Sequence, residues 1–244
     1  MAFHKLLKKW WYLLKISVIL PTINEEEGIG PTLDAIDKDY FKRKSWELEI
    51  VIVDGDSKDN TQKIAKEKGA KVIIEKRKGY GRAYKTGLSK VTGDIIVTGD
   101  ADATYPFDHI HEYIGILIKE KLDFITTDRF ANLHHGSMSV KHYFGNSVLA
   151  WTLRILFLTN LRDSQSGMWI FKKDALEKIQ PLELFNNGMP FSEEIKIEMF
   201  TNKNIRSKEI PSQLRARAGQ VKIESFSDGW KNLKFLFKKR VTSY

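Results

Sequence analysis

The feature of this sequence that most constrains its fold is a regular alternation of short apolar runs with amphipathic segments. The runs are rich in isoleucine and valine, which is typical of strands buried on both faces of a parallel sheet. They are Ile16–Leu20, Leu48–Val53, Lys71–Ile74, Ile95–Thr98 and Phe124–Thr127. The segments between them, near 26–38, 59–68, 80–90 and 108–120, have the pattern of helices. Strands and helices that alternate in this way predict a doubly wound α/β sheet.

The second half of the chain follows a different pattern. We expect a long apolar helix near 144–160, a strand near 167–172, a helix near 192–202 and a strand near 205–210. No internal repeat, low-complexity tract or linker divides the sequence. It therefore predicts one domain over residues 15–225, flanked by amphipathic helices at 1–14 and 226–244.

The positive charge of the chain is concentrated at its two ends. The net charge is +9, of which residues 1–15 contribute +4 and residues 202–244 contribute +8, whereas residues 16–201 carry −3. Basic ends suit an anionic membrane surface, a polyanion or a phosphate-bearing substrate. A nucleic-acid-binding module would need a basic face across the body of the protein, so we expect no nucleic-acid partner.

The chain contains no cysteine. This excludes disulfides, thiolate metal sites and thiol nucleophiles, and it fits a reducing compartment. No stretch reaches the roughly 18 uncharged apolar residues of a membrane-spanning helix, because Arg154 interrupts the longest candidate, residues 148–161. The N-terminus also lacks the features of a signal peptide. We therefore expect a protein that lies peripherally on the cytoplasmic face of a membrane.

Both ends of the chain have the periodicity of amphipathic helices. In residues 1–15 the apolar side chains fall on one helical face and the lysines on the other. A second apolar stripe lies beside a run of basic residues near the C-terminus and consists of Phe226, Trp230, Leu233, Phe237 and Val241. We expect both helices to bind an anionic bilayer surface. The alternative is that both helices pack on the domain.

Acidic and polar residues follow three of the predicted strands. The first strand ends in Pro21-Thr22-Ile23-Asn24-Glu25, the second runs into Asp54-Gly55-Asp56, and the fourth runs into Gly99-Asp100-Ala101-Asp102. Ligands of such sheets bind at the carboxyl ends of the strands, so we expect these side chains to meet. Clustered carboxylates indicate a site for a divalent cation or a hydroxyl-rich ligand. Asp100 and Asp102 suit Mg²⁺ or Mn²⁺ bound to a nucleotide diphosphate.

These motifs, in this order, resemble those of a known enzyme family. ISVILPTINEE, IVIVDGDSKDNT, RKGYGRA and GDADATYP are similar to segments of inverting family-2 glycosyltransferases of the GT-A fold. Further segments, TDR at 127–129, RDSQSG at 162–167 and RARAGQVK at 215–222, resemble the dolichyl-phosphate mannose and glucose synthases. The resemblance implies a single GT-A domain with a mostly parallel central sheet. It also implies metal-dependent, inverting transfer of a hexose or N-acetylhexosamine to dolichyl or polyprenyl phosphate, which supplies lipid-linked sugar for protein glycosylation.

The resemblance implies a role for each matching residue. The residues that would bind the nucleotide-sugar donor are Pro21, Thr22, Glu25, Asp54, Asp56, Lys78, Arg82, Asp100, Ala101 and Asp102. Of these, Asp100 and Asp102 would also hold the metal ion, Mg²⁺ or Mn²⁺. The residues that would bind the acceptor phosphate are Arg129, Arg217 and Lys222. Asp100, Asp102, Arg129 and Arg217 would together form the catalytic group.

The sequence departs from the mannose synthases at several motif positions. Thr104 stands where they carry a glutamine, Ile23 where they carry a tyrosine, and Val221 where they carry a serine. The RDSQSG segment is more similar to the glucose synthases. These departures favour a UDP-sugar over GDP-mannose as the donor.

The type of acceptor decides whether the enzyme needs a general base. A phosphate monoester is already anionic near neutral pH, because its second pKa is about 6. It therefore needs arginine and lysine side chains for positioning, and residues 203–222 are rich in both. The alternative acceptor is a sugar hydroxyl, as in polysaccharide or glycan synthesis, which would require a carboxylate base. The candidate bases are Asp128, Asp163, Glu193 and Glu194, although we interpret Glu193-Glu194 as a charge pair at a helix N-terminus.

Overall fold

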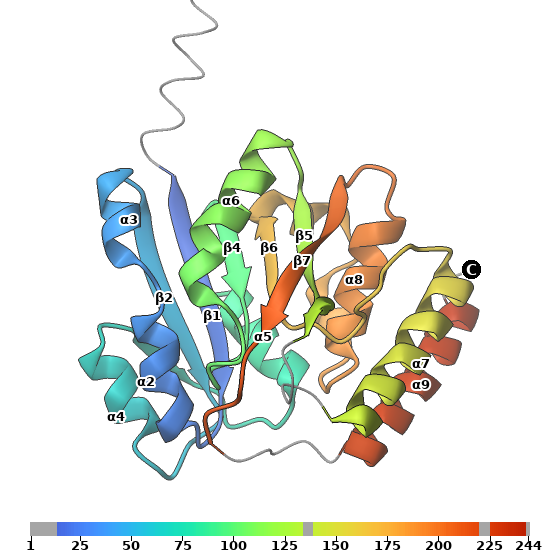
Figure 1. Ribbon diagram of the computed structural model, residues 1–244, viewed down its shortest axis with the longest axis horizontal. Helices are drawn as coiled ribbons and strands as arrows, with labels where there is room; N and C mark the ends of the chain where they lie inside the picture. The colour runs from blue at the N-terminus through green and yellow to red at the C-terminus, as the bar shows by residue number, and fades with distance from the viewer. Residues whose placement is uncertain (1–13, 134–138, 220–224, 243–244) are drawn as a thin grey trace, which may run out of the picture.

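The computed structural model describes residues 14–133, 139–219 and 225–242 (Figure 1). Within these residues the strands form one sheet in the order β3-β2-β1-β4-β6-β5-β7. The strands are β1 (Lys15–Thr22), β2 (Glu47–Asp54), β3 (Lys71–Ile74), β4 (Ile95–Thr98), β5 (Phe124–Leu133), β6 (Trp169–Lys172) and β7 (Ser207–Leu214). β6 runs antiparallel to both of its neighbours, and the other pairs are parallel. The prediction of one α/β domain with a mostly parallel sheet is confirmed.

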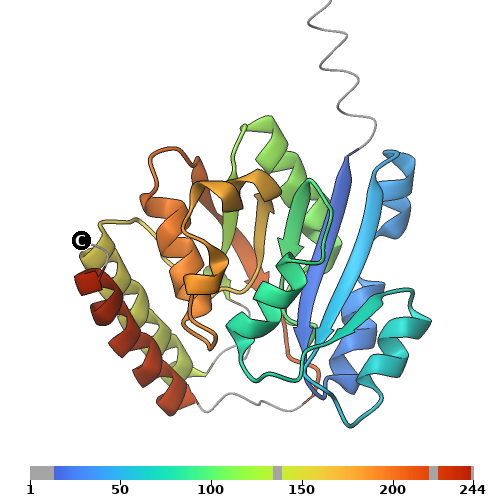
Figure 2. The same cartoon turned by 180° about the vertical axis from the view of Figure 1, so that it is seen from behind.

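Helices cover both faces of the sheet. They are α2 (Glu26–Asp34), α3 (Lys38–Arg43), α4 (Thr61–Glu67), α5 (Tyr80–Leu88), α6 (Ile110–Lys119), α7 (Val140–Phe157), α8 (Phe191–Thr201) and α9 (Ser225–Thr242), with 3-10 turns at Phe107–His109, Lys173–Lys178 and Leu182–Leu184. Figure 1 shows α2, α3, α4 and α6 in front of the sheet, and the reverse view in Figure 2 shows α5 and α8 on the opposite face.

The alternation of side chains along β1 shows how the sheet divides the core. Ile16, Val18 and Leu20 belong to the apolar cluster beneath α2, α3 and α6, whereas Ile19 belongs to the cluster beneath α5 and α8. Successive side chains of a strand point to opposite faces, so one Ile/Val-rich run supplies both clusters. This two-sided burial holds the carboxyl ends of the central strands in fixed positions.

α7 and α9 form a further layer outside the sheet and the helices that cover its two faces. They lie side by side beyond α8 in both views (Figures 1 and 2). Leu149 and Leu153 of α7 and Leu236 of α9 are buried together with Ile197 of α8. No helix in the described part of the chain is long and apolar enough to cross a membrane.

Several predicted element boundaries differ from the structure. The expected helix near 26–38 is α2 and ends at Asp34. A separate helix that was not predicted, α3, begins at Lys38, where the carboxylate of Asp37 accepts a hydrogen bond from the Tyr40 amide. The expected helix near 144–160 begins at residue 140, where the Ser139 hydroxyl caps it. The expected strand near 205–210 extends as β7 to Leu214 beside the lengthened β5. The predicted C-terminal helix is α9, and the predicted helix at 1–14 falls on residues that lie outside the described part.

Candidate functional site

The carboxyl ends of β1 and β2 are joined by a buried carboxylate. Asp54 is fully buried and accepts hydrogen bonds from the Thr22 hydroxyl (2.9 Å), the Ser57 amide (2.8 Å) and the Gln62 amide group (2.8 Å). Its oxygens are therefore used within the chain, and Asp54 fixes the shape of this edge. Asp56 has a left-handed backbone (φ 67°) and pairs with Lys58 at 2.7 Å on the surface.

The loop after β4 presents the two aspartates of the predicted metal site. Asp102 is buried, and its Oδ1 accepts hydrogen bonds from the Thr104 amide (3.1 Å) and hydroxyl (2.6 Å). Gly28 lies against this loop so closely that a Cβ there would come within 2.6 Å of the Ala101 carbonyl oxygen. The first turn of α2 is thus packed directly on the aspartate loop, which requires glycine at this position.

Asp100 is half-buried at the same edge. The Tyr80 hydroxyl donates a long hydrogen bond of 3.5 Å to its Oδ1. Burial raises the pKa of Asp100 to about 7, and the nearby charge of Asp102 acts in the same direction. Two carboxylates in this arrangement repel each other, and a bound cation would relieve that repulsion.

The residues present fit a divalent cation with few protein ligands. No group of three or more acidic or histidine side chains in the described residues has the geometry of a metal site. Mg²⁺ commonly takes only one or two carboxylates and fills its other positions with phosphate oxygens and water. Asp100 and Asp102 are suited to that role, with the remaining ligands coming from a nucleotide diphosphate.

Arg217 reaches this loop from the far end of the chain. Its Nη1 donates to Asp102 Oδ2 at 2.5 Å and its Nη2 to Glu25 Oε1 at 2.7 Å. The segment that carries it follows β7 and is held by hydrogen bonds from the Ala218 amide to the Asp102 carbonyl and from the Arg215 amide to the Thr104 carbonyl, both 2.9 Å. The structure thus brings together Glu25, Asp100, Asp102 and Arg217, four of the residues predicted for the site.

Arg129 is held on the β5 side of the site by a buried carboxylate. Its Nε and Nη2 donate to the two oxygens of Asp163 at 2.6 and 2.9 Å, in a two-point pair. The side chain of Asp163 is 0% exposed and that of Arg129 is 12% exposed. Arg129 also lies close enough to Asp100 for its charge to oppose the increase in the pKa of that carboxyl. It therefore belongs to the site, with its orientation fixed by Asp163.

The loop at 163–167 packs against both Arg129 and Asp100. The Lys196 ammonium donates to the Ser164 carbonyl at 2.6 Å, and the Gln165 amide group donates to Glu193 at 2.6 Å. At the end of the loop the Gly167 amide donates to the Tyr105 hydroxyl at 2.6 Å. A Cβ on Gly167 would lie 3.5 Å from Asp100 Oδ1, which places this loop directly against the aspartate.

Glu193 and Glu194 lie in the first turn of α8, as the sequence predicts, but both are buried. Glu193 is fully buried and burial raises its pKa to about 8. Glu194 accepts hydrogen bonds from the Asn186 amide (2.7 Å) and the Lys239 ammonium (3.1 Å). The pair is therefore part of the interior between α8, the loop at 163–167 and α9, and not a solvated charge pair.

The increased pKa of Glu193 predicts a dependence of stability on pH. An unfolded glutamate titrates near pH 4.3, so from about pH 4.5 to 8 the folded protein keeps a proton that the unfolded chain releases. The contribution of Glu193 to the free energy of unfolding must then fall as the pH rises through this window. Relative to Glu193→Gln, the free energy of unfolding of the wild type should decrease by about 2 kcal/mol between pH 5 and 7.

Urea denaturation of both proteins at several pH values measures this difference. Burial lowers the pKa of Lys196 to about 7, so this lysine acts in the opposite sense above pH 7 and the comparison stays below that pH. Glu120→Gln, at an exposed glutamate, is the matched control. Parallel curves for the wild type and Glu193→Gln would contradict the prediction.

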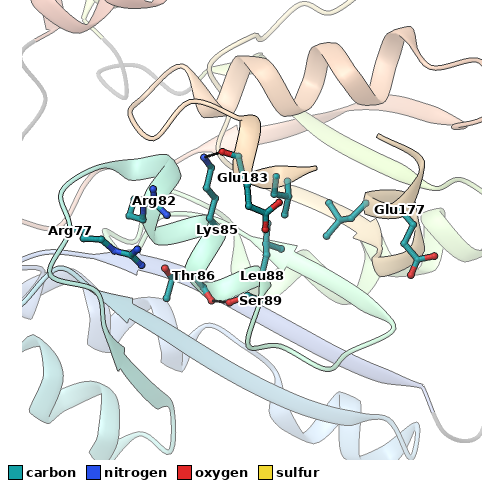
Figure 3. A pocket seen from close by; sticks show the side chains of 10 residues that line it. Arg77, Arg82, Lys85, Thr86, Leu88, Ser89, Glu177 and Glu183 are labelled. Carbon is teal, nitrogen blue, oxygen red and sulfur yellow. Dashed lines mark hydrogen bonds between the residues drawn. The ribbon is translucent and has the colours of Figure 1, made fainter. Parts of the chain in front are cut away.

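Two of the predicted donor residues lie apart from this cluster. Lys78 is exposed, and Arg82 lines a cavity of about 400 Å³ on the outer side of α5 (Figure 3). Figure 3 shows Arg77 and Lys85 beside it; Arg77 pairs with Glu75 at 2.6 Å, and the Lys85 ammonium donates to the carbonyls of Glu183 and Phe185. No residue of the carboxylate cluster lines this cavity. Lys222 falls outside the described residues.

The sequence reasoning missed the buried polar groups that support the site. Tyr80 stands between the two glycines of the RKGYGRA motif, and that placement was the available signal. Tyr105 lies in the GDADATYP motif, which was the available signal for it. Lys196 carried no recognisable signal, because a lysine within a helix occurs in any surface pattern. Lys196 is nevertheless fully buried, with its ammonium on the loop at 163–167.

Comparison with known proteins shows similarity to one family of glycosyltransferases. Residues 17–180 match the family model described as glycosyl transferase family 2. The chain is 34% identical over 91% of its length to the low-salt glycan biosynthesis hexosyltransferase Agl6 of Haloferax volcanii, but it spans only 52% of that protein. It is 30% identical to the dolichyl-phosphate hexose transferase of the same organism, over 88% of this chain and 89% of that protein.

The fold is also that of a solved glycosyltransferase. The structure of glucosyl-3-phosphoglycerate synthase from Mycobacterium tuberculosis, in complex with Mn²⁺, UDP and glucosyl-3-phosphoglycerate, superposes with a TM-score of 0.72. The match covers 93% of this chain and 80% of that one at 20% sequence identity. At this identity the similarity supports the fold alone.

Proposed function

Because the chain belongs to glycosyl transferase family 2, we propose that it transfers a hexose or N-acetylhexosamine from a nucleotide sugar to dolichyl or polyprenyl phosphate. The observation that carries this proposal is the meeting of acidic and cationic side chains at one edge of the sheet. Glu25, Asp100 and Asp102 face Arg217, and Arg129 lies beside Asp100. Such a site offers carboxylates for a metal-bound diphosphate and guanidinium groups for a second phosphate.

The donor side of the proposed reaction uses the ends of β1 and β4. Asp100 and Asp102 would hold Mg²⁺ or Mn²⁺, which neutralises the charge that develops on the departing diphosphate. Pro21, Thr22 and Glu25 would line the nucleotide pocket, and Ala101 would contact the donor through its backbone. We propose a UDP-linked donor, on the basis of the motif departures at Thr104 and in RDSQSG.

The acceptor side uses the two arginines. A lipid phosphate arrives as an anion and attacks the anomeric carbon directly, with inversion, so the enzyme has to position it and shield its charge. Arg129 is suited to this because Asp163 fixes the plane of its guanidinium. Arg217, which bonds to Asp102 and Glu25, supplies a second guanidinium group.

The four carboxylates that a sugar-hydroxyl acceptor could use as a base are all buried. Asp128 accepts a hydrogen bond from the Phe130 amide and lies 3.5 Å from Arg162, and Asp163 is paired with Arg129. Glu193 and Glu194 are buried in the interior. Two of these four side chains pair with arginines and all four are buried, so none is exposed to an incoming sugar hydroxyl, which favours the phosphate acceptor.

A surface formed by α7 and α9 supports attachment to a membrane. We call it the α7–α9 surface; its apolar side chains, each more than half exposed, are Phe144, Trp151, Ile155, Trp230, Phe237 and Val241. Arg154 lies over the Trp151 ring at 4.9 Å and Lys234 over the Trp230 ring at 5.5 Å. Aromatic rings combined with basic side chains are typical of surfaces that bind anionic headgroups.

The C-terminal helix α9 has one buried face and one exposed face. Asn232, Leu236 and Lys239 are buried against the domain, and Lys239 lies between Glu194 (3.1 Å) and Glu198 (2.8 Å). Trp230 and Phe237 point outward. We propose that the inner face anchors α9 and that the outer face contacts the bilayer, which brings the site near a lipid phosphate.

Liposome flotation tests this surface. The wild-type protein should float with anionic vesicles, and less so at high salt, because the attraction of basic side chains to anionic lipid is screened. A Phe144→Glu/Phe237→Glu variant should float clearly less than the wild type, although it keeps the second expected attachment at residues 1–14. Ile74→Glu, an exposed apolar position on the edge strand β3, is the matched control and should float like the wild type. Unchanged flotation of the double variant would show that the α7–α9 surface does not contact the bilayer.

A donor and acceptor screen tests the reaction itself. Radiolabelled UDP- and GDP-sugars are offered with dolichyl phosphate, and the organic phase is assayed for labelled lipid. We expect labelled lipid with a UDP-sugar and none when dolichol replaces dolichyl phosphate. Transfer to a free sugar acceptor without transfer to the lipid phosphate would replace this proposal with the hydroxyl-acceptor alternative.

A further inference from the structure

The guanidinium group of Arg217 occupies the space between two carboxylates of the donor site. Asp102 and Glu25 lie on different loops, and Arg217 bonds to both, at 2.5 and 2.7 Å. The three residues are far apart in the sequence, and the arginine side chain is only 21% exposed. A positive charge of the protein itself therefore lies where clustered carboxylates would otherwise attract a metal ion.

Both oxygens of Asp102 are engaged by the chain. Oδ1 accepts two hydrogen bonds from Thr104, and Oδ2 accepts the charge-assisted bond from Arg217. A divalent ion that takes a carboxylate oxygen of Asp102 has to compete with these partners. The bond from Arg217 is the one that a second cation opposes most directly, because both cations are attracted to the same negative charge.

The segment that carries Arg217 has its own attachments to the aspartate loop. The amides of Arg215 and Ala218 bond to backbone carbonyls of the loop, and the Arg215 side chain bonds to Asp108 at 3.0 Å. None of these contacts uses the Arg217 side chain. The Arg217 guanidinium can therefore leave Asp102 for another partner while the segment at 215–218 stays attached to the aspartate loop.

We infer that Arg217 is a counter-cation of the donor-site carboxylates and competes with the divalent ion for Asp102. The inference rests on the proposed function, because it takes Asp102 as a metal ligand. When the ion and the donor diphosphate bind, the freed guanidinium becomes available for a phosphate, which offers it the same two-point geometry as a carboxylate. Arg217 thus alternates between a carboxylate partner without the donor and a phosphate partner with it.

Binding of Mn²⁺ alone, without nucleotide or acceptor, tests this competition. The paramagnetic resonance signal of free Mn²⁺ gives the affinity of the full-length protein and of Arg217→Gln, which keeps a polar side chain but removes the charge. The variant should bind Mn²⁺ about 10-fold more tightly than the wild type, since one charge-assisted bond no longer competes. Arg217→Lys keeps the positive charge but not the planar guanidinium group, and its Mn²⁺ affinity should stay close to that of the wild type.

Arg215→Gln is the matched control, because it removes a charge from the same segment but from the neighbour of Asp108. It separates direct competition from a general change of electrostatic potential and should leave Mn²⁺ affinity within about 2-fold of the wild type. Equal affinities of Arg217→Gln and Arg215→Gln, or no Mn²⁺ binding by either folded variant, would overturn the inference. Failure of the proposed function has a different signature: tighter Mn²⁺ binding by Arg217→Gln, but no sugar transfer to dolichyl phosphate from any donor.

Discussion

Replacing Asp102 by asparagine should reduce sugar transfer by at least about 100-fold, because we propose that Asp102 holds the metal ion, and a charged metal ligand contributes several kcal/mol to stabilising the leaving diphosphate. Asparagine keeps the acceptor oxygen that Thr104 uses, so the loop after β4 should remain folded. The change also places an amide in front of the Arg217 guanidinium, which removes a charge-assisted bond of 2.5 Å. The initial rate at saturating donor, measured over a range of Mg²⁺ and Mn²⁺ concentrations, gives the effect.

The control for this experiment is Asp94→Asn. Asp94 precedes β4 at the opposite end of the strand and accepts a hydrogen bond from the Lys15 amide on the exposed surface. Its substitution should leave transfer within a few-fold of the wild type, and circular dichroism should show both variants folded. Wild-type turnover by Asp102→Asn at limiting metal concentration would show that the metal assignment is wrong.

Replacing Asp163 by asparagine should have the largest effect on stability. The change removes the carboxylate that is bonded to the buried guanidinium of Arg129, and breaking a buried pair in this way costs about 3–5 kcal/mol. Although burial opposes it, Arg129 holds the pKa of Asp163 below its usual value, so the carboxylate is ionised in the folded protein. Transfer should fall as well, because Arg129 loses the group that orients it beside Asp100. Urea denaturation at neutral pH measures the loss of stability.

Two comparisons separate this pair from other causes of instability. The double variant Arg129→Gln/Asp163→Asn removes both charges, so it should lose less stability than the sum of the two single changes. Glu120→Gln breaks the exposed ion pair with Lys208 at 2.8 Å and should cost less than about 1 kcal/mol. If Asp163→Asn is no more destabilising than Glu120→Gln, the buried pair does not hold the loop at 163–167 in place.

The parts of the fold that the sequence predicted well are those with a strong local signal. The runs Lys71–Ile74 and Ile95–Thr98 are β3 and β4 with the same bounds, because each is a short β-branched run between polar turns. The separate helix α3 was missed, since its start depends on the capping carboxylate of Asp37. The extension of β5 and β7 was missed because each strand is completed by pairing with the other, which neither run encodes alone.

The site divides in the same way. The sequence placed Asp100 and Asp102 at a strand end, and the parallel sheet brings that end to Glu25 of the first loop. It also assigned the two arginines Arg129 and Arg217 to the phosphates. It did not reveal that each arginine is paired with one or two carboxylates, or that Glu193 and Lys196 are buried. From sequence alone, a charged residue in a helical pattern is predicted to be solvent-exposed, and only the packing of the neighbouring elements shows that it is buried.

The sequence by itself determined the alternating strands, their order along the chain, and the acidic residues that follow them, because these depend on the local preferences of a few adjacent residues. Only the tertiary structure decided which charges meet. Arg217 lies 115 residues from Asp102 and 192 from Glu25, and their contact depends on β7 docking at the edge of the sheet. The same holds for α9, where the burial of Leu236 and the exposure of Trp230 follow from packing against α7 and α8. Local pattern fixes which side chains a segment offers, whereas long-range packing fixes which of them face a partner and which face solvent or a membrane.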